Sequence, residues 1–505
     1  MKTLLLPILS IFLCGQLHAQ GAPLTRTSPI NIEQVPLAPG AGLVDRDADH
    51  ATVAMNSERD IVVAFHTSRT DISQTMKQVE YAYYEWQSGD TWTHLKTEVI
   101  GSTGHNPLGL NQQIVKCERP DVVAVGDKFF IIWTRRYQSA SEPNEPAVLE
   151  CAWLEKSSPG VVAIRNNGLA FGLGFELDAH VPNPLGLPGL REFYVKDCAG
   201  VPDAVILNDA GLAAGSVKVA VVYPHQTDGF TSGTSGARKF DSRVITCTLD
   251  SANTLTKGPF EDLQNQIPFN GPTSPGGGAS AGLILPDLAP SPEDNAFWLI
   301  AETQTMAVSL PHGKIRLQYW QFDAGTGSWE LQASKTYKSP SFPYVKPYVR
   351  RRPNVSSFPE VGLNPTVTLA FNKKDPNPPV GGDGSTNVVL DQVEYDGNGF
   401  VTPTTPLALW PNDPAFGDGK PVPLRGKVGA SIPSCFADRA PGLLATCDIV
   451  TNNLTVLDTN AYDSVARPAA AYHYHLGAAN PHYVVPIWEK KIAAGGPTII
   501  WIGVF

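Results

Sequence analysis

The sequence predicts an all-β chain folded as a single β-propeller, and three observations predict it. Apolar runs are short, rich in Val, Ile, Tyr and Trp, and are broken by Gly or Pro. Gly (45) and Pro (44) make up 89 of 505 residues, well above the roughly 12 % of typical globular chains. A pattern of Pro, strand, turn and second strand recurs along the chain, as in 117–133, CERPDVVAVGDKFFIIW. Repeated units of irregular length are typical of propeller blades with variable loops.

The repeated unit begins with a first strand that Pro opens in six of seven cases. Pro is tolerated there because its missing N–H falls outside the ladder of strand hydrogen bonds. The unit at 47–66 has His50 where the others have Pro. The six Pro markers are Arg119-Pro120-Asp121, Val201-Pro202-Asp203, Leu285-Pro286-Asp287, Arg352-Pro353-Asn354, Ile432-Pro433-Ser434 and Arg467-Pro468-Ala469. The second strands read DIVVAFH, KFFIIWT, VKVAVVY, NAFWLIAE, PTVTLAFN, LLATCDI and YVVPIWE.

These units predict seven blades of four antiparallel strands, with six blades as the alternative if 432–457 is an elaboration of its neighbour. The last marker leaves room for only three strands, at 466–474, 482–489 and 497–505. We expect SPINIEQVPL (28–37) to supply the fourth strand of that blade. An N-terminal strand would then close the ring and leave no open sheet edge.

The first 19 residues are predicted to be a signal peptide, with residues 20–505 forming the single propeller domain. Lys2 gives the positive start, 4–14 the apolar stretch, and Leu17-His18-Ala19 a cleavage site. The alternative is an N-terminal anchor helix, but about 11 apolar residues are too short to span a bilayer. No later stretch is long and apolar enough either, so we expect a secreted or periplasmic protein without a membrane span.

Six cysteines remain after Cys14, and an even number in an exported chain suggests disulfides. Two of them flank a turn, where cross-strand Cβ atoms come within bonding range. The other four precede first strands or lie in third strands of the same two units. The predicted pairs are Cys435–Cys447, Cys117–Cys151 and Cys198–Cys247.

Several classes of function are excluded or disfavoured by the sequence. The net charge of −10 is spread without a basic stripe, which argues against nucleic acid as a partner. No G-x-S-x-G elbow, H-E-x-x-H, P-loop or dinucleotide fingerprint is present, and no cofactor is expected. Asp45, Asp47 and Asp49 resemble the start of a calcium loop, but His50 and Asn56 stand where an EF-hand needs Gly and Glu. A solvated acidic loop is favoured over a looser calcium site, so no metal is expected.

Three first strands open with Arg-Pro, and first strands line the axis of a propeller. Arg119, Arg352 and Arg467 are therefore predicted to converge at the mouth of the ring, where guanidinium groups would bind a carboxylate or sulfate. The alternative is that each arginine pairs with an aspartate of its own or the next blade. Asp121, Asp203 and Asp287 recur at one position of the repeat, which favours a structural role such as holding a neighbouring blade.

The chain resembles sialidase-like propellers, which hold the carboxylate of an acidic sugar with three arginines. Fragments of that family's Asp-box occur as SGDTW (88–92) and DAGTGSW (323–329), whereas its Arg-Ile-Pro opening is absent. The resemblance implies a propeller that binds or hydrolyses a glycan, with an acidic sugar as its ligand, so that an enzyme would be a glycoside hydrolase. Arg351 has the family's spacing to Pro353, and Tyr472 is the predicted aromatic group near the mouth. The alternative is a non-catalytic scaffold for protein contacts at the cell surface.

Overall fold

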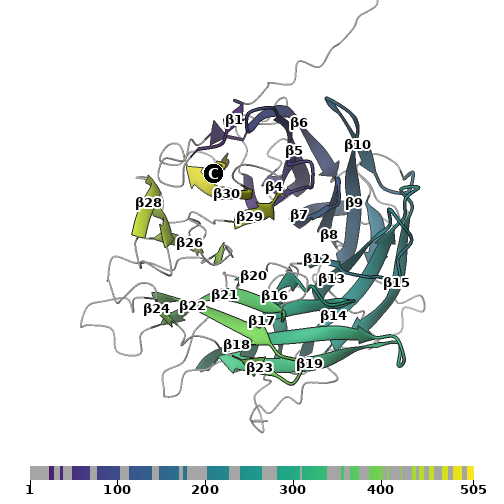
Figure 1. Cartoon of the computed structure of the whole chain (residues 1–505), viewed down its shortest axis with the longest axis vertical. Helices are drawn as coiled ribbons and strands as arrows, with labels where there is room; N and C mark the ends of the chain where they lie inside the picture. The colour runs from purple at the N-terminus through teal and green to yellow at the C-terminus, as the bar shows by residue number, and fades with distance from the viewer. Residues whose placement is uncertain are drawn as a thin grey trace, which may run out of the picture.

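The structure is a computed structural model in which strands surround a centre (Figure 1). No helix in the described part of the chain is long and apolar enough to cross a membrane. The described residues are 22–27, 35–37, 48–68, 77–102, 113–138, 147–169, 174–178, 202–226, 239–263, 281–307, 310–337, 354–357, 364–374, 386–401, 407–408, 422–423, 435–439, 443–447, 454–459, 469–475, 481–491 and 498–505.

The strands form antiparallel sets in chain order, and the first strands of successive sets lie against one another around the ring. This arrangement confirms the all-β propeller. The first two sets are β3 (Ala48–Met55), β4 (Ile61–Ser68), β5 (Lys77–Gln87) and β6 (Thr91–Gly101), then β7 (Gln113–Val125), β8 (Lys128–Gln138), β9 (Ala147–Ser158) and β10 (Val161–Arg165), with β11 (Phe175–Asp178) beside β9. The next two are β12 (Asp203–Leu207), β13 (Val217–Gln226), β14 (Lys239–Leu249) and β15 (Leu255–Asp262), then β16 (Ala281–Pro290), β17 (Ala296–Ala307), β18 (Leu310–Asp323) and β19 (Ser328–Tyr337).

The remaining sets differ in size. One consists of β20 (Asn354–Ser357), β21 (Thr366–Lys374), β22 (Thr386–Tyr395) and β23 (Phe400–Val401), with β24 (Leu407–Ala408) beside β22. A smaller sheet contains β25 (Val422–Pro423), β26 (Cys435–Arg439), β27 (Leu443–Cys447) and β28 (Leu454–Thr459). The last set contains β29 (Ala469–Tyr474), β30 (His482–Lys491) and β31 (Thr498–Ile502).

Six of these sets pack against a neighbouring set through an apolar cluster, so the structure supports the six-blade alternative and not the predicted seven equivalent blades. The apolar clusters of the described residues join the sets that begin at β3, β7, β12, β16, β20 and β29. The sheet β25–β28 contacts mainly β20 and β21 of the preceding blade. The packing therefore supports the six-blade alternative, in which 432–457 elaborates its neighbour.

The second strands are apolar on both faces because each lies between two blades. In β4, Ile61 and Val63 pack with Ile487 of the last blade, whereas Val62 packs with Ile131 of the next one. Alternating side chains of one strand thus enter two different cores. Burying each such side chain contributes about 1.5–3 kcal/mol. The largest fully buried side chains include Trp92, Trp133, Trp153, Trp298, Trp320 and Trp488.

The N-terminal segment closes the ring, as predicted. β2 (Val35–Pro36) pairs with β31, placing Val35 opposite Ile502. β1 (Leu24–Thr25) pairs instead with β6 of the first blade, and Thr27 N–H donates to the Val504 carbonyl. The segment therefore joins the first and last blades, while residues 28–34 lie outside the described residues.

The predicted pair Cys117–Cys151 is not formed, because both are free, buried thiols. First and third strands are separated by two strand spacings, about 10 Å, whereas disulfide-bonded Cα atoms lie at most about 7 Å apart. The two thiols also enter different cores, with Cys151 in the same core as Cys247.

The other two predicted disulfides have different outcomes. Cys247 is also a free, buried thiol, so it forms no bond to Cys198, which lies outside the described residues. The backbones of Cys435 and Cys447 face each other across β26 and β27, as the hairpin argument requires. A bond between their sulfur atoms stays a prediction.

Candidate functional site

The mouth of the ring is the face where first strands begin and second strands end. At this face β3 has a bulge between Asp49 and Thr52, and β7 has one between Glu118 and Asp121. β16 is interrupted at the same place of the repeat. A bulge adds one residue to a strand, bends it and re-aims the side chains around it, and bulges are frequent beside active sites.

Both bulges contain a residue in the left-handed region of backbone space. His50 has φ of 52° and Arg119 has φ of 55°. The register aligns His50 with Arg119, so the sequence alignment of His50 with Pro120 was wrong by one residue. Residues other than Gly rarely adopt this conformation, which costs about 1–3 kcal/mol and clusters at functional sites.

Each bulge N–H donates to a side chain of the preceding blade. Arg119 N–H donates to His66 Nδ1 at 3.1 Å, and His50 N–H donates to Glu489 Oε1 at 2.9 Å. His66 and Glu489 occupy equivalent places near the ends of β4 and β30. The sequence contained this signal, because most of the second strands end in a polar residue, as in AFH and IWE.

Nitrogen-bearing side chains gather around these bulges. The imidazole of His50 stacks on that of His66, with ring centroids 4.8 Å apart and an interplanar angle of 23°. Lys77 Nζ lies 3.1 Å from His66 Nε2 and 3.8 Å from a carboxylate oxygen of Glu118. Because His66 Nδ1 accepts the Arg119 N–H, a neutral His66 ring has its proton on Nε2, and the Lys77 ammonium, which only donates, is then a close neighbour of Nε2 without a hydrogen bond to it.

Three buried carboxylates complete the site. Glu80 accepts hydrogen bonds from Thr67 Oγ1 at 2.5 Å and from Gln78 Nε2 at 2.7 Å. Glu118 pairs with a lysine and Glu489 accepts a backbone N–H, so each carboxylate has a donor. We call the following residues the mouth cluster: His50, His66, Lys77, Glu80, Glu118, Arg119 and Glu489.

A buried ion pair supports the mouth cluster from within the second blade. Arg135, the strand partner of Cys117, pairs with Glu150 at 2.6 Å. Trp133 Nε1 donates to the same Glu150 oxygen at 3.0 Å. Burial raises the pKa of Glu150, although the Arg135 guanidinium acts in the opposite direction. Gly174 packs so closely here that an added Cβ would lie 2.5 Å from the Trp133 ring.

Two of the three recurring aspartates, Asp121 and Asp203, hold neighbouring blades together, which confirms the structural role predicted for them. Asp121 Oδ2 accepts the N–H of Ala204, 3.1 Å away in the next first strand. Asp203 Oδ2 accepts the N–H of Leu288 one blade further on. The same repeat position thus links three successive first strands.

The predicted binding residues have different outcomes. Arg119 lies at the mouth, within the bulge of β7. Arg351, Arg352 and Arg467 lie outside the described residues, so the arginine triad stays a prediction. Tyr472 lies toward the hairpin at the far end of β29, where its Oη is 2.6 Å from His482 Nδ1. The acidic loop that resembles the start of a calcium site is described only in part, since Asp45 and Asp47 lie outside the described residues. In the described part of the chain no three His, Cys, Asp or Glu residues are grouped to hold a metal.

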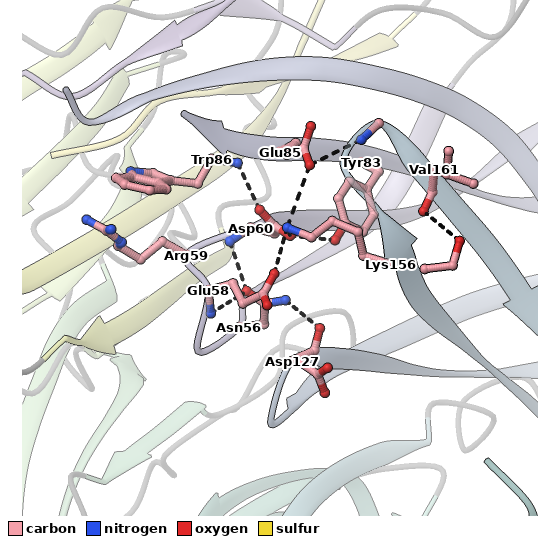
Figure 2. Close-up of polar contacts among 12 residues, drawn as sticks. Asn56, Glu58, Arg59, Asp60, Tyr83, Glu85, Trp86, Asp127, Lys156 and Val161 are labelled. Atoms are coloured by element: carbon pink, nitrogen blue, oxygen red, sulfur yellow. Dashed lines mark hydrogen bonds and ion pairs between the residues drawn. The ribbon is translucent and has the colours of Figure 1, made fainter. Parts of the chain in front are cut away.

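The face opposite the mouth contains a second polar cluster, which joins the first two blades (Figure 2). Asp60 accepts from Tyr83 Oη at 2.7 Å and from the Trp86 N–H at 2.8 Å. Lys156 of β9 pairs with Asp60 at 2.7 Å and with Glu58 at 2.6 Å. Burial opposes the charge of Lys156, but these partners outweigh it and raise the pKa of its ammonium. With its charges paired across blades, this cluster is structural.

No family model and no curated protein matches the chain. Solved structures similar to it include a Dyadobacter fermentans protein of unknown function, at 11 % identity, with 96 % of this chain and 98 % of that chain covered and a TM-score of 0.39. A Trypanosoma rangeli sialidase matches at 9 % identity over 96 % of this chain and 59 % of its own, with a TM-score of 0.37. An ulvan lyase of polysaccharide lyase family PL25 matches at 10 % identity over 90 % and 94 % of the two chains, with a TM-score of 0.45. The resemblance to sialidase-like propellers is weak, and likeness at this level says nothing of what this chain binds.

Proposed function

We propose that the mouth cluster binds an acidic carbohydrate and cleaves it by β-elimination beside a sugar carboxylate. One observation supports this proposal best: the stacked imidazoles of His50 and His66, the Lys77 ammonium and Arg119, whose backbone is left-handed, lie together at the mouth. Such a set offers both positive charge and nitrogen bases in one place.

Binding needs donors for the carboxylate of a uronic acid. The guanidinium of Arg119 presents a planar fork that matches a carboxylate, and Lys77 adds a second positive charge nearby. Charge placed against the carboxylate also makes the hydrogen on the adjacent carbon more acidic, because the anion formed there is stabilised electrostatically.

The reaction then needs a base and an acid. We assign the base to His50, which lies within the bulge and stacks on His66, because an imidazole suits proton transfer near neutral pH. His50 takes the proton from the carbon beside the carboxylate. The electrons of that C–H bond form a C=C bond, and the bond to the glycosidic oxygen breaks. That oxygen takes a proton from the Lys77 ammonium.

Glycoside hydrolysis fits the mouth cluster less well. Hydrolases of this kind need two carboxyl groups flanking the scissile bond, one of which donates a proton. Glu80 and Glu489 act as hydrogen-bond acceptors and Glu118 pairs with Lys77, so these carboxylates already hold neighbouring donor groups in place. We also propose that the chain is exported and that its substrate is an extracellular polymer that contains an acidic sugar.

The alternative of a non-catalytic scaffold predicts an apolar patch on the surface. The exposed large apolar side chains of the described residues are Val161, Leu169, Phe260 and Val401, which come from three different blades. They supply no specific support for a scaffold.

The test is incubation of the mature chain with a panel of polyuronates, followed by two parallel assays. Ultraviolet absorbance reports the unsaturated sugar that elimination leaves, and a reducing-end assay reports any cleavage. We expect both signals to rise together. Reducing ends without unsaturation would show hydrolysis instead, and binding without either signal would show a lectin-like protein. Absence of binding and cleavage across the panel would refute the proposal.

A further inference from the structure

We infer that the left-handed bulges of β3 and β7 aim the side chains of His50 and Arg119 at the mouth, at a cost to folding stability, and that His50 is a specificity-determining residue beside Arg119. The kind of ligand that these residues select rests on the proposed function. The bulge itself is a property of the fold and is tested separately.

The positions of the left-handed residues support this inference. Within the described residues, left-handed residues other than Gly comprise His50, Arg59, Asp90, Arg119, Asn167, Asn253 and Asn295. Only His50 and Arg119 lie within strands, and both occupy the same place of the repeat. In the described part of the chain β16 has a bulge at the same place but no left-handed residue there, so the left-handed backbone accompanies these two side chains and is not a requirement of the repeat.

The types of residue at the bulges are the second line of evidence. Where the chain only needs a left-handed turn it often uses residues that adopt the conformation easily, such as Asn253 or Gly126. A bulge needed for the fold alone could use Gly at lower cost. His50 and Arg119 instead combine the strained backbone with side chains that bind or transfer protons.

The hydrogen bonds at the bulges fix the backbone to which these side chains are attached. The N–H of Arg119 donates to His66 and the N–H of His50 donates to Glu489, in each case from one blade to the preceding blade. Because the N–H is held, the backbone of the bulge cannot rotate freely. Side chains held in this way are pre-organised for a ligand.

The residue at the bulge position differs among the blades in which the structure describes it. It is His50 in β3, Arg119 in β7 and Leu285 in β16. A change of this residue should alter which sugar is accepted while the blade keeps its strands.

The experiment compares Ala with Gly at His50 and at Arg119, with the same two substitutions at Val123 as the matched control. Ala removes the functional side chain but keeps the strain of a left-handed backbone, whereas Gly removes the side chain and relieves that strain. Val123 lies in β7 beyond the bulge and has no left-handed backbone. We expect the Gly variants to melt above the Ala variants at His50 and Arg119, and below the Ala variant at Val123.

The same variants are titrated with polyuronate oligomers. At His50 and Arg119 both Ala and Gly should weaken binding or turnover at least about tenfold, whereas the Val123 variants should retain it. Gly variants that melt below Ala variants at the bulges would overturn the inference, as would unchanged selectivity after loss of either side chain. A wild-type chain that binds no polyuronate would refute the proposed function, while the melting order would still decide whether the bulges are strained.

Discussion

His473 makes the seam between the last and first blades sensitive to acid. Its Nε2 is buried and has no hydrogen-bond partner among the described residues. Its ring lies 6.1 Å from that of His475 and 6.4 Å from that of Tyr483. Arg59 donates to Tyr483 Oη at 3.2 Å, so positive charge already stands nearby. Burial, then His475 and Arg59, lower the pKa of His473 to about 4 from its usual 6.5.

The sign and size of the effect follow from these two pKa values. Between pH 4 and 6.5 the unfolded chain binds a proton on His473 that the folded chain does not bind. The contribution of His473 to stability is therefore full above pH 6.5 and is lost as the pH falls toward 4. The difference corresponds to about 3 kcal/mol, and partial access of solvent reduces it to about 1–2 kcal/mol.

The perturbation is His473→Gln, which keeps a polar side chain but cannot titrate. Denaturant unfolding at pH 7 and pH 4.5 gives the loss of stability on acidification for the wild type and the variant. We expect the variant to lose about 1–2 kcal/mol less than the wild type. His475→Gln removes one positive neighbour and should reduce the loss in part. An equal loss in the wild type and His473→Gln would refute this reasoning.

Three further predictions concern how the ring is held together. Removing residues 1–40 should lower the melting temperature of the whole domain, because β1 and β2 join the first and last blades; a truncated chain that melts like one that keeps residues 20–40 would contradict this closure. Asp121→Ala should cost about 1–3 kcal/mol of unfolding free energy, because it leaves the buried N–H of Ala204 without its acceptor, and Asp121→Asn should recover part of the loss in denaturant unfolding. Non-reducing peptide mapping should recover Cys435 and Cys447 in one disulfide-linked peptide, because their backbones face each other. Two free thiols at these positions would contradict the predicted disulfide.

Much of the fold could be predicted from the sequence, because its signals are local. Short apolar runs between Gly and Pro mark strands, and the recurring Asp121 and Asp203 mark the links between first strands. The number of blades could not be predicted in this way. The strands at 435–459 look like those of any other unit, and only the contacts of their sheet with β20 and β21, made through β25, identify them as an elaboration.

The mouth cluster was harder to predict, because a bulge leaves no clear mark in sequence. The bulges of β3 and β7 each contain one extra residue, so the alignment of His50 with Pro120 was wrong by one residue. The bulge in β7 also shifts the register between Cys117 and the residues that follow Asp121. The polar ends of the second strands were visible, but their meeting with the next blade's bulge depends on how neighbouring blades pack. Arg119 was predicted from its repeat position, whereas His66 was not.

The most direct test of the account is the rate at which unsaturated sugar ends form on a polyuronate, compared among wild type, His50→Gln and His475→Gln. His50 lies at the mouth, whereas His475 follows β29 at the opposite end of the first strand. Loss of a general base typically costs about 10²–10⁴ in rate. We predict such a loss for His50→Gln, with thermal unfolding showing a folded variant, and a rate near that of the wild type for His475→Gln. A folded His50→Gln variant that keeps the wild-type rate would contradict catalysis at the mouth cluster.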